Sequence, residues 1–79
     1  MFSRIALAED LPEENLRRGD VATIVEYYEG GPGLEPGYEL EVFNSAGDTV
    51  AVVTVRESQI ELLRKDEMLC VRPRERVAA

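Results

Sequence analysis

The sequence predicts an all-β domain, a small barrel of about five short antiparallel strands with one short helical turn. Apolar residues recur mostly with a spacing of two, as in half-buried strands, and seldom with the wider spacing of a helix. Clusters of glycine, proline and acidic residues separate the apolar runs. The 79 residues allow one domain with a thin core, and closing the strands into a barrel would hide their edges.

The opening segment, SRIAL, predicts a strand with Ile5 and Leu7 on one face. The acidic stretch that follows, AEDLPEENLRRGD, contains a proline and cannot be a regular strand. We expect a loop or a single helical turn there, anchored beneath by Leu11 and Leu16.

The second strand, VATIVEYY, begins after an Arg-Gly-Asp turn. In that turn Gly19 bends the chain and Asp20 hydrogen-bonds the local backbone, which is a simpler role than adhesion. Alternation then divides the strand into two faces, Val21, Thr23, Val25 and Tyr27 on one and Ala22, Ile24, Glu26 and Tyr28 on the other. The connector EGGPGLEPG ends the strand and forbids regular structure.

The segment YELEVF gives the clearest strand in the chain. Tyr38, Leu40 and Val42 are expected to face inward, while Glu39 and Glu41 face water. The turn NSAGD follows, and TVAVVTV returns as the next strand, so the two form a hairpin with a glycine-containing loop.

The C-terminal part is predicted to contain the helical turn and the last strand. RESQIELL favours a short helical turn that returns Ile60 and Leu63 to the core. MLCVR is short and apolar, which favours a last strand that Pro73 ends. The sequence thus divides into a barrel domain, residues 1–63, and a C-terminal extension, residues 64–79, with the basic tail RPRER.

Charge and composition argue against several classes of function. The net charge is −7: residues 1–55 carry three arginines against eleven acidic residues, so this part offers no basic face for nucleic acid. No apolar run approaches the roughly 20 residues that cross a bilayer. Cys70 is the one cysteine, expected to be a small buried hydrophobe, and a disulfide within the chain is impossible. We therefore expect a cytoplasmic protein that binds neither membrane nor nucleic acid.

The residues of common catalytic and metal sites are mostly absent. The chain has no histidine, the usual general base near neutral pH. The glycine connector lacks the Lys-Ser/Thr pair of a phosphate-binding loop. Acidic side chains could gather around calcium or magnesium, but without the spacing of a calcium loop a solvated loop is expected at Glu9, Asp10, Glu13 and Glu14. We expect no enzyme activity, no metal and no cofactor.

The tyrosines that flank the glycine connector carry the candidate partner site. Under strict alternation Tyr27 and Tyr28 cannot both face the core, so at least one ring is exposed, and tyrosine is favoured at protein interfaces. The alternative is that both rings cover the open end of the barrel. The candidate contact residues are Tyr27, Tyr28, Leu34, Tyr38, Glu39 and Glu41.

These features predict a non-enzymatic protein-interaction module whose acidic face engages a basic or neutral protein partner. The alternative is a self-associating subunit, a homo-oligomer that pairs through an exposed edge of TVAVVTV or MLCVR.

Several ordered blocks within residues 2–63 resemble a family of very small bacterial proteins catalogued only as a domain of unknown function. The blocks are Asp10-Leu11-Pro12, Leu16, Gly19-Asp20-Val21, Thr23-Ile24-Val25 and Tyr38-Glu39-Leu40-Glu41-Val42-Phe43. The sequence departs from the family pattern at Ala22, where glycine is common, and in its extension past Leu63. The resemblance implies a Src-homology-3-like barrel with no enzyme activity. It also suggests a binding partner encoded by a neighbouring gene, or a toxin–antitoxin-like pair in which this protein restrains the toxin. A role as an accessory subunit of a larger assembly is the alternative.

Overall fold

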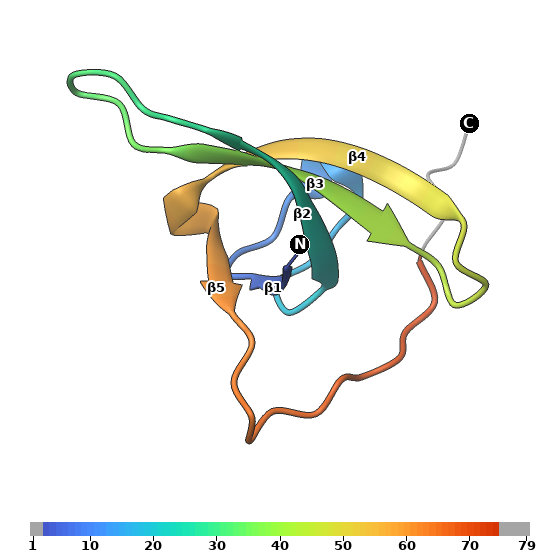
Figure 1. The fold of residues 1–79 in the computed structure, drawn as a ribbon. Coiled ribbons are helices and arrows are strands. Elements are labelled where there is room, and N and C mark those ends of the chain that lie inside the picture. Colours follow the sequence, from blue (N-terminus) through green and yellow to red (C-terminus); the bar gives the residue numbers. More distant parts are fainter. Residues whose placement is uncertain (1–2, 75–79) are drawn as a thin grey trace.

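Five antiparallel strands form one sheet in the computed structural model, which describes residues 3–74 (Figure 1). The spatial order is β4-β3-β2-β1-β5, with two short 3-10 turns, η1 and η2, between strands. The bounds are β1 Arg4–Leu7, η1 Pro12–Glu14, β2 Val21–Tyr28, β3 Gly37–Phe43, β4 Thr49–Arg56, η2 Glu57–Gln59 and β5 Ile60–Leu62. The predicted all-β class with five antiparallel strands is confirmed.

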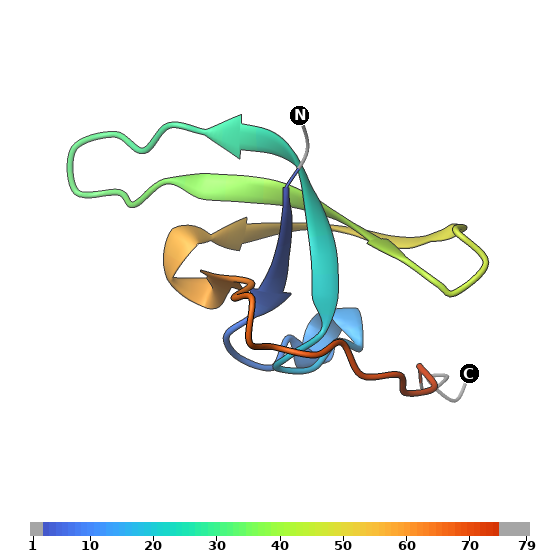
Figure 2. The ribbon, with the colours of Figure 1, turned by 60° about the horizontal axis from the view of Figure 1, so that its bottom comes forward.

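The sheet is not closed into a barrel, which corrects the predicted closure. β4 and β5 are its two edges, and in the described part of the chain no strand pairing joins them. The turn η2 directs the chain away from β4, so the three residues of β5 add to β1 instead of folding back along β4. Figure 2 shows how β2 bends, so that its first half runs beside β1 and its second half beside β3.

The core lies on the concave side of this bent sheet. Its largest fully buried side chains are Ile5, Leu7 and Leu40, each expected to face inward from the alternation of its strand. The remaining buried members of the cluster are Leu16, Ala22, Val42, Val53 and Val55. The predicted anchoring of the acidic loop is also confirmed. Leu16 is buried, Leu11 packs against the core, and their backbones pair with each other across the loop.

A β-bulge in β2 changes which side chains face the core. Before the bulge Ile24 lies opposite Leu40, and after it Tyr27 lies opposite Tyr38, so one extra residue is inserted between these pairs. Strict alternation placed Tyr27 on the face opposite to Ile24, and that prediction is wrong. The inserted residue moves Tyr27 to the core side and turns Glu26 and Tyr28 outward.

The C-terminal elements differ most from expectation. The helical turn predicted for RESQIELL is limited to η2, because Ile60–Leu62 pairs with the edge of β1 and becomes β5. MLCVR forms no strand and pairs with neither open edge of the sheet, and Cys70 is exposed rather than buried. The last part of the basic tail, residues 75–76, lies outside the described residues.

Candidate functional site

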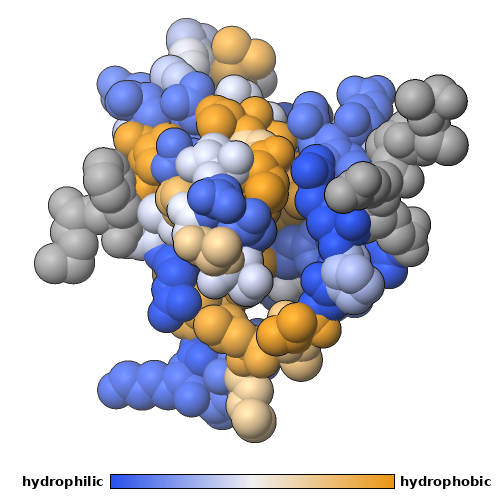
Figure 3. Space-filling model, turned by 90° about the vertical axis from the view of Figure 1, so that its right-hand side faces the viewer, coloured by the Kyte–Doolittle hydropathy of each residue, from blue (hydrophilic) through white to orange (hydrophobic). Residues whose placement is uncertain are grey.

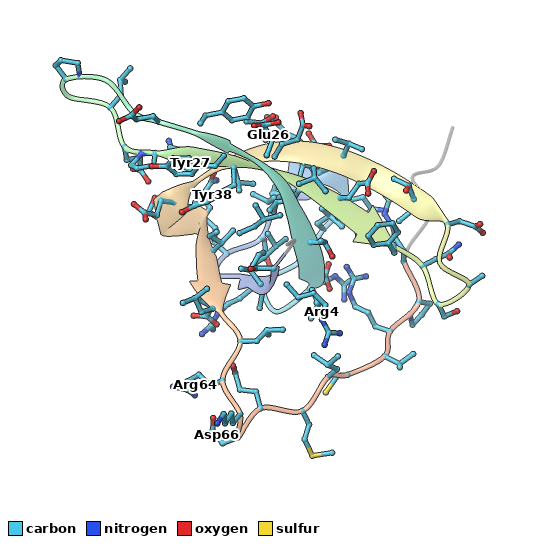
Figure 4. All side chains as sticks on the ribbon, viewed as in Figure 1. Arg4, Glu26, Tyr27, Tyr38, Arg64 and Asp66 are labelled. Atoms are coloured by element: carbon cyan, nitrogen blue, oxygen red, sulfur yellow. The ribbon has the colours of Figure 1, made fainter. Side chains whose placement is uncertain are left out.

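The outward side of β2 and β3 carries a group of side chains that we call the acidic face: Glu26, Tyr28, Glu39 and Glu41. Glu26 lies directly opposite Glu39 in the strand register, and Glu41 follows two residues along on the same side of β3. Figure 4 shows Glu26 on one side of β2 and the rings of Tyr27 and Tyr38 on the other. The bulge in β2 is what brings Glu26 onto this face.

The three glutamates of the acidic face lack compensating positive charge. None of the ion pairs among residues 3–74 includes Glu26, Glu39 or Glu41. Like charges directly opposite each other in antiparallel strands cost stability, on the order of a few tenths of a kcal/mol for an exposed pair. Repulsion between Glu26 and Glu39 therefore lowers the stability of the sheet slightly, and no ion pair among residues 3–74 offsets this cost.

Tyr28 is the aromatic member of the acidic face. Its ring is 45% exposed, and its hydroxyl donates a long hydrogen bond of 3.4 Å to Oε1 of Glu39. Partial desolvation, followed by the negative charge of Glu39 and the hydrogen bond to it, raises the pKa of Tyr28 above its ordinary 10.0. The charge of Glu26 acts in the same direction.

Substitution Glu39→Gln is expected to lower the pKa of Tyr28 toward its ordinary value, because it removes the nearer of the two negative charges. NMR titration of the tyrosine ring signals would measure the shift for each ring separately. Glu61→Gln, on the exposed side of β5, is the matched control and should leave the Tyr28 signals unchanged. An unaltered Tyr28 titration in Glu39→Gln would contradict the placement of these two side chains.

Tyr27 and Tyr38 form a separate aromatic pair on the core side of the sheet. Their ring centroids lie 5.3 Å apart with planes tilted by 52°, within the range of favourable aromatic contacts. Tyr38 packs against the core, and desolvation raises its pKa, with smaller effects from the Glu57 charge and from Tyr27. Tyr27 is 52% exposed, so one ring of the pair is available to solvent.

The connector between β2 and β3, residues 29–36, projects from the sheet as an arm (Figure 1). At its tip the N–H of Leu34 donates to the Gly31 carbonyl at 2.9 Å, and Gly33 has φ of 78°, which closes a type II-like turn after Pro32. Gly30 has no substitute there, since a Cβ would lie 2.2 Å from the Leu34 carbonyl oxygen. The arm is thus shaped by specific turn chemistry.

The base of the arm is fastened to η2. The Glu35 carboxylate accepts the N–H of Ser58 at 2.8 Å, and the N–H of Glu57 donates to the Pro36 carbonyl at 2.9 Å. The hydrogen bonds from Ser58 lower the pKa of Glu35. These contacts fasten the base of the arm to η2, and Leu34, 73% exposed, lies at its tip.

The six predicted contact residues therefore lie in three places. Tyr28, Glu39 and Glu41 come together on the acidic face, whereas Tyr27 and Tyr38 lie on the opposite side of the sheet. Leu34 lies apart from both groups, at the tip of the arm. The sequence analysis missed Glu26, because only the bulge, which depends on the register with β3, turns it outward.

A second polar cluster fastens the C-terminal segment, residues 64–74, to the sheet. Arg72 binds the Asp20 carboxylate with two nitrogens, Nε to Oδ1 at 2.8 Å and Nη2 to Oδ2, and the N–H of Arg17 also donates to Oδ2 at 2.8 Å. Gly19, with φ of 91°, makes the bend before Asp20, so the expected turn is confirmed. Figure 3 shows apolar residues at the surface in the lower part of the molecule, where this segment exposes Met68, Leu69 and Val71.

Metal-binding clusters and membrane-spanning helices are both absent from the described residues. Across residues 3–74, no group of three or more acidic or cysteine side chains is arranged to hold a metal ion. No helix in that range is long and apolar enough to cross a membrane. Within the acidic loop, the Asp10 carboxylate accepts the N–H of Arg18 at 2.8 Å.

The fold and the acidic face together define a small β-sheet domain with one open sheet and an uncompensated acidic surface. The chain belongs to the family described as Domain of unknown function (DUF4926), whose model matches residues 1–62. The match ends at Leu62, the last residue of β5, so the C-terminal segment lies beyond it. Searches of the curated proteins and of the solved structures found no match.

Proposed function

We propose that this protein is a non-enzymatic protein-interaction module that binds a basic partner protein through its acidic face. The observation that carries the proposal is the Glu26–Glu39 pair, two like charges placed directly opposite each other with no arginine or lysine paired to them. A partner that supplies lysine or arginine would remove the repulsion, so binding relieves a conflict present in the isolated domain.

Tyr28 and the overall charge support the same proposal. A tyrosine whose ring is half exposed beside two carboxylates offers an apolar surface and a hydrogen-bonding tip, the combination enriched at interface centres. The net charge of −7 steers a basic partner toward the domain and makes the association rate sensitive to salt.

Charge reversal Glu39→Lys is expected to abolish partner binding, because it places a positive charge where the partner's basic side chain must lie. The measurement is affinity capture of the tagged protein from its native cells, followed by calorimetry with the purified partner. Glu61→Lys makes the same charge change on β5, outside the acidic face, and should retain binding. Tyr28→Ala should weaken binding while changing the free energy of unfolding by less than about 1 kcal/mol. Equal binding by both reversal variants would refute the acidic face as the contact surface.

The identity of the partner is proposed from the family resemblance. In this proposal the protein acts in the bacterial cytoplasm, and its partner is a toxin that it restrains or a larger assembly that it joins as an accessory subunit. A Src-homology-3-like relationship is part of the same proposal. It is supported by the 3-10 turn between β4 and β5 and by the pairing of β5 with β1.

A second candidate function is self-association, and the edge strand β4 favours it. The eight-residue strand carries no charged residue before Arg56, and the side chain of Val52 is 54% exposed. Long uncharged edges can pair with a second copy across a two-fold axis. Light scattering coupled to gel filtration would reject this candidate if the mass stayed monomeric as the concentration rises.

A further inference from the structure

We propose that the unpaired edge of β4 binds an extended, arginine-rich segment of the partner as an additional strand. This inference rests on the proposed function, since the acidic face supplies part of the charge that selects the segment. It specifies the conformation of the partner and the contacts that hold it.

The edge of β4 is suited to strand addition. β4 pairs with β3 on one side, and within residues 3–74 the backbone of residues 51–55 makes no hydrogen bond beyond that pairing. From Thr49 to Val55 the strand contains neither proline nor a charged side chain, the usual devices that block pairing at an edge. Main-chain hydrogen bonds to such an edge give affinity, and alternate side chains of the added strand give specificity.

A hollow of about 320 Å³ borders this edge at Thr54 and provides room for side chains of the added segment. Thr54 of β4 and Gln59 border it on one side, and the acidic loop with η1 borders it on the other. The loop contributes three acidic residues to the lining, Asp10, Glu13 and Glu14. A strand laid along β4 would therefore have an acidic wall on its inner side.

The acidic face supplies negative charge on the outer side. Glu39 lies opposite Thr54, and Glu41 lies opposite Val52, so only short side chains separate these carboxylates from the edge. An added strand would lie about 4.8 Å from β4, and the flexible stems of arginine or lysine can extend over one intervening strand. Basic side chains at alternate positions of the segment would thus reach Glu39 and Glu41.

The chain itself holds a guanidinium next to the hollow, between the end of η1 and the start of β4. Arg74 donates through Nη2 to the carbonyl oxygen of Glu14, at the end of η1, at 3.0 Å. Its Nη1 makes a longer contact of 3.4 Å with the carbonyl oxygen of Val50, at the start of β4. An arginine thus already bridges η1 and the start of the same edge strand, which favours an arginine-bearing segment over an acidic or purely apolar one.

The test uses the full chain and an eight-residue peptide of alternating arginine and threonine. Two control peptides match it in length: one has glutamate in place of arginine, and the other is N-methylated at alternate residues, which removes backbone donors and keeps the charge. We expect the first peptide to bind, the glutamate peptide not to bind, and the methylated peptide, which lacks up to four donors, to bind at least tenfold more weakly. Alternate backbone amides of β4 should exchange with solvent about tenfold more slowly in the complex, by NMR.

The outcomes separate this inference from the proposed function. If both arginine peptides bind equally, without protection of β4 and with loss of binding in Glu39→Lys, strand addition is wrong and the acidic face is retained. If neither binds, strand addition is overturned, and capture of the partner with Glu39→Lys and Glu61→Lys decides the proposed function alone. Protection of β4 without peptide, together with a dimer mass, would assign the edge to a second copy and overturn the inference.

Discussion

Leu40→Ala is expected to lower the free energy of unfolding by about 2–5 kcal/mol, because it leaves a cavity at the centre of the core. Leu40 has no exposed surface and lies in β3 between Ile24 of β2 and Val53 of β4. A domain of this size has a total stability of only about 5–15 kcal/mol, so the substitution removes a large fraction of it.

Urea denaturation followed by circular dichroism would measure this loss, since the chain has no tryptophan for fluorescence. Val52→Ala is the matched control on the neighbouring strand. Its side chain is largely exposed, and the variant should differ from the parent by no more than about 0.5 kcal/mol. Comparable losses in the two variants would mean that the sheet does not bury the face described for it.

Asp20→Asn is expected to destabilise the protein by about 1–2 kcal/mol and to release the C-terminal segment. The substitution removes the charge that Arg72 binds through two nitrogens, and the side chains of Asp20 and Arg72 are both largely shielded from solvent. The loss is smaller than for a fully buried pair because solvent still screens these groups. NMR signals of residues 68–74 should move toward their positions in an unfolded chain.

The same pair makes stability depend on acid. Burial alone would raise the pKa of Asp20, but the hydrogen bonds from Arg72 and from the Arg17 N–H, with the charges of both arginines, outweigh it and lower the pKa below 3.8. A carboxyl with a depressed native pKa contributes its full stability above the unfolded value and loses it as the pH falls through the native value. Stability should therefore fall below about pH 3.8, and less steeply in Asp20→Asn than in the parent. Identical acid limbs for the two proteins would show that Arg72 does not bind Asp20 in solution.

The strands β1 to β4 could be predicted because each is a short alternating or β-branched apolar run bounded by residues that favour turns. β5 could not, since Ile60–Leu62 is only three residues long and its local sequence suits a helical turn equally well. Residues 60–62 become a strand because they hydrogen-bond to the edge of β1 that β2 leaves unpaired. MLCVR, although apolar, pairs with neither of the two open edges of the sheet and stays irregular.

The candidate site was predictable where it depends on one strand and not where it depends on two. Glu39 and Glu41 share a face because they are two residues apart, and the sequence alone indicates this. The bulge gives β2 one extra residue relative to β3. It places Glu26 on the same face as Glu39 and Glu41, and Tyr27 on the opposite face. Such a bulge follows from pairing between strands, and nothing within VATIVEYY identifies it.

The pairing of β1 with β5 has a consequence for how the chain acquires its fold. The hairpins β2–β3 and β3–β4 join neighbouring segments, so they can form early at a small cost in chain entropy. Ile5 and Leu62, by contrast, pair although nearly the whole sequence of the domain separates them. Their contact therefore forms only after the intervening chain has folded. During synthesis β1 therefore emerges first but completes its hydrogen bonding last, after Leu62 has left the ribosome.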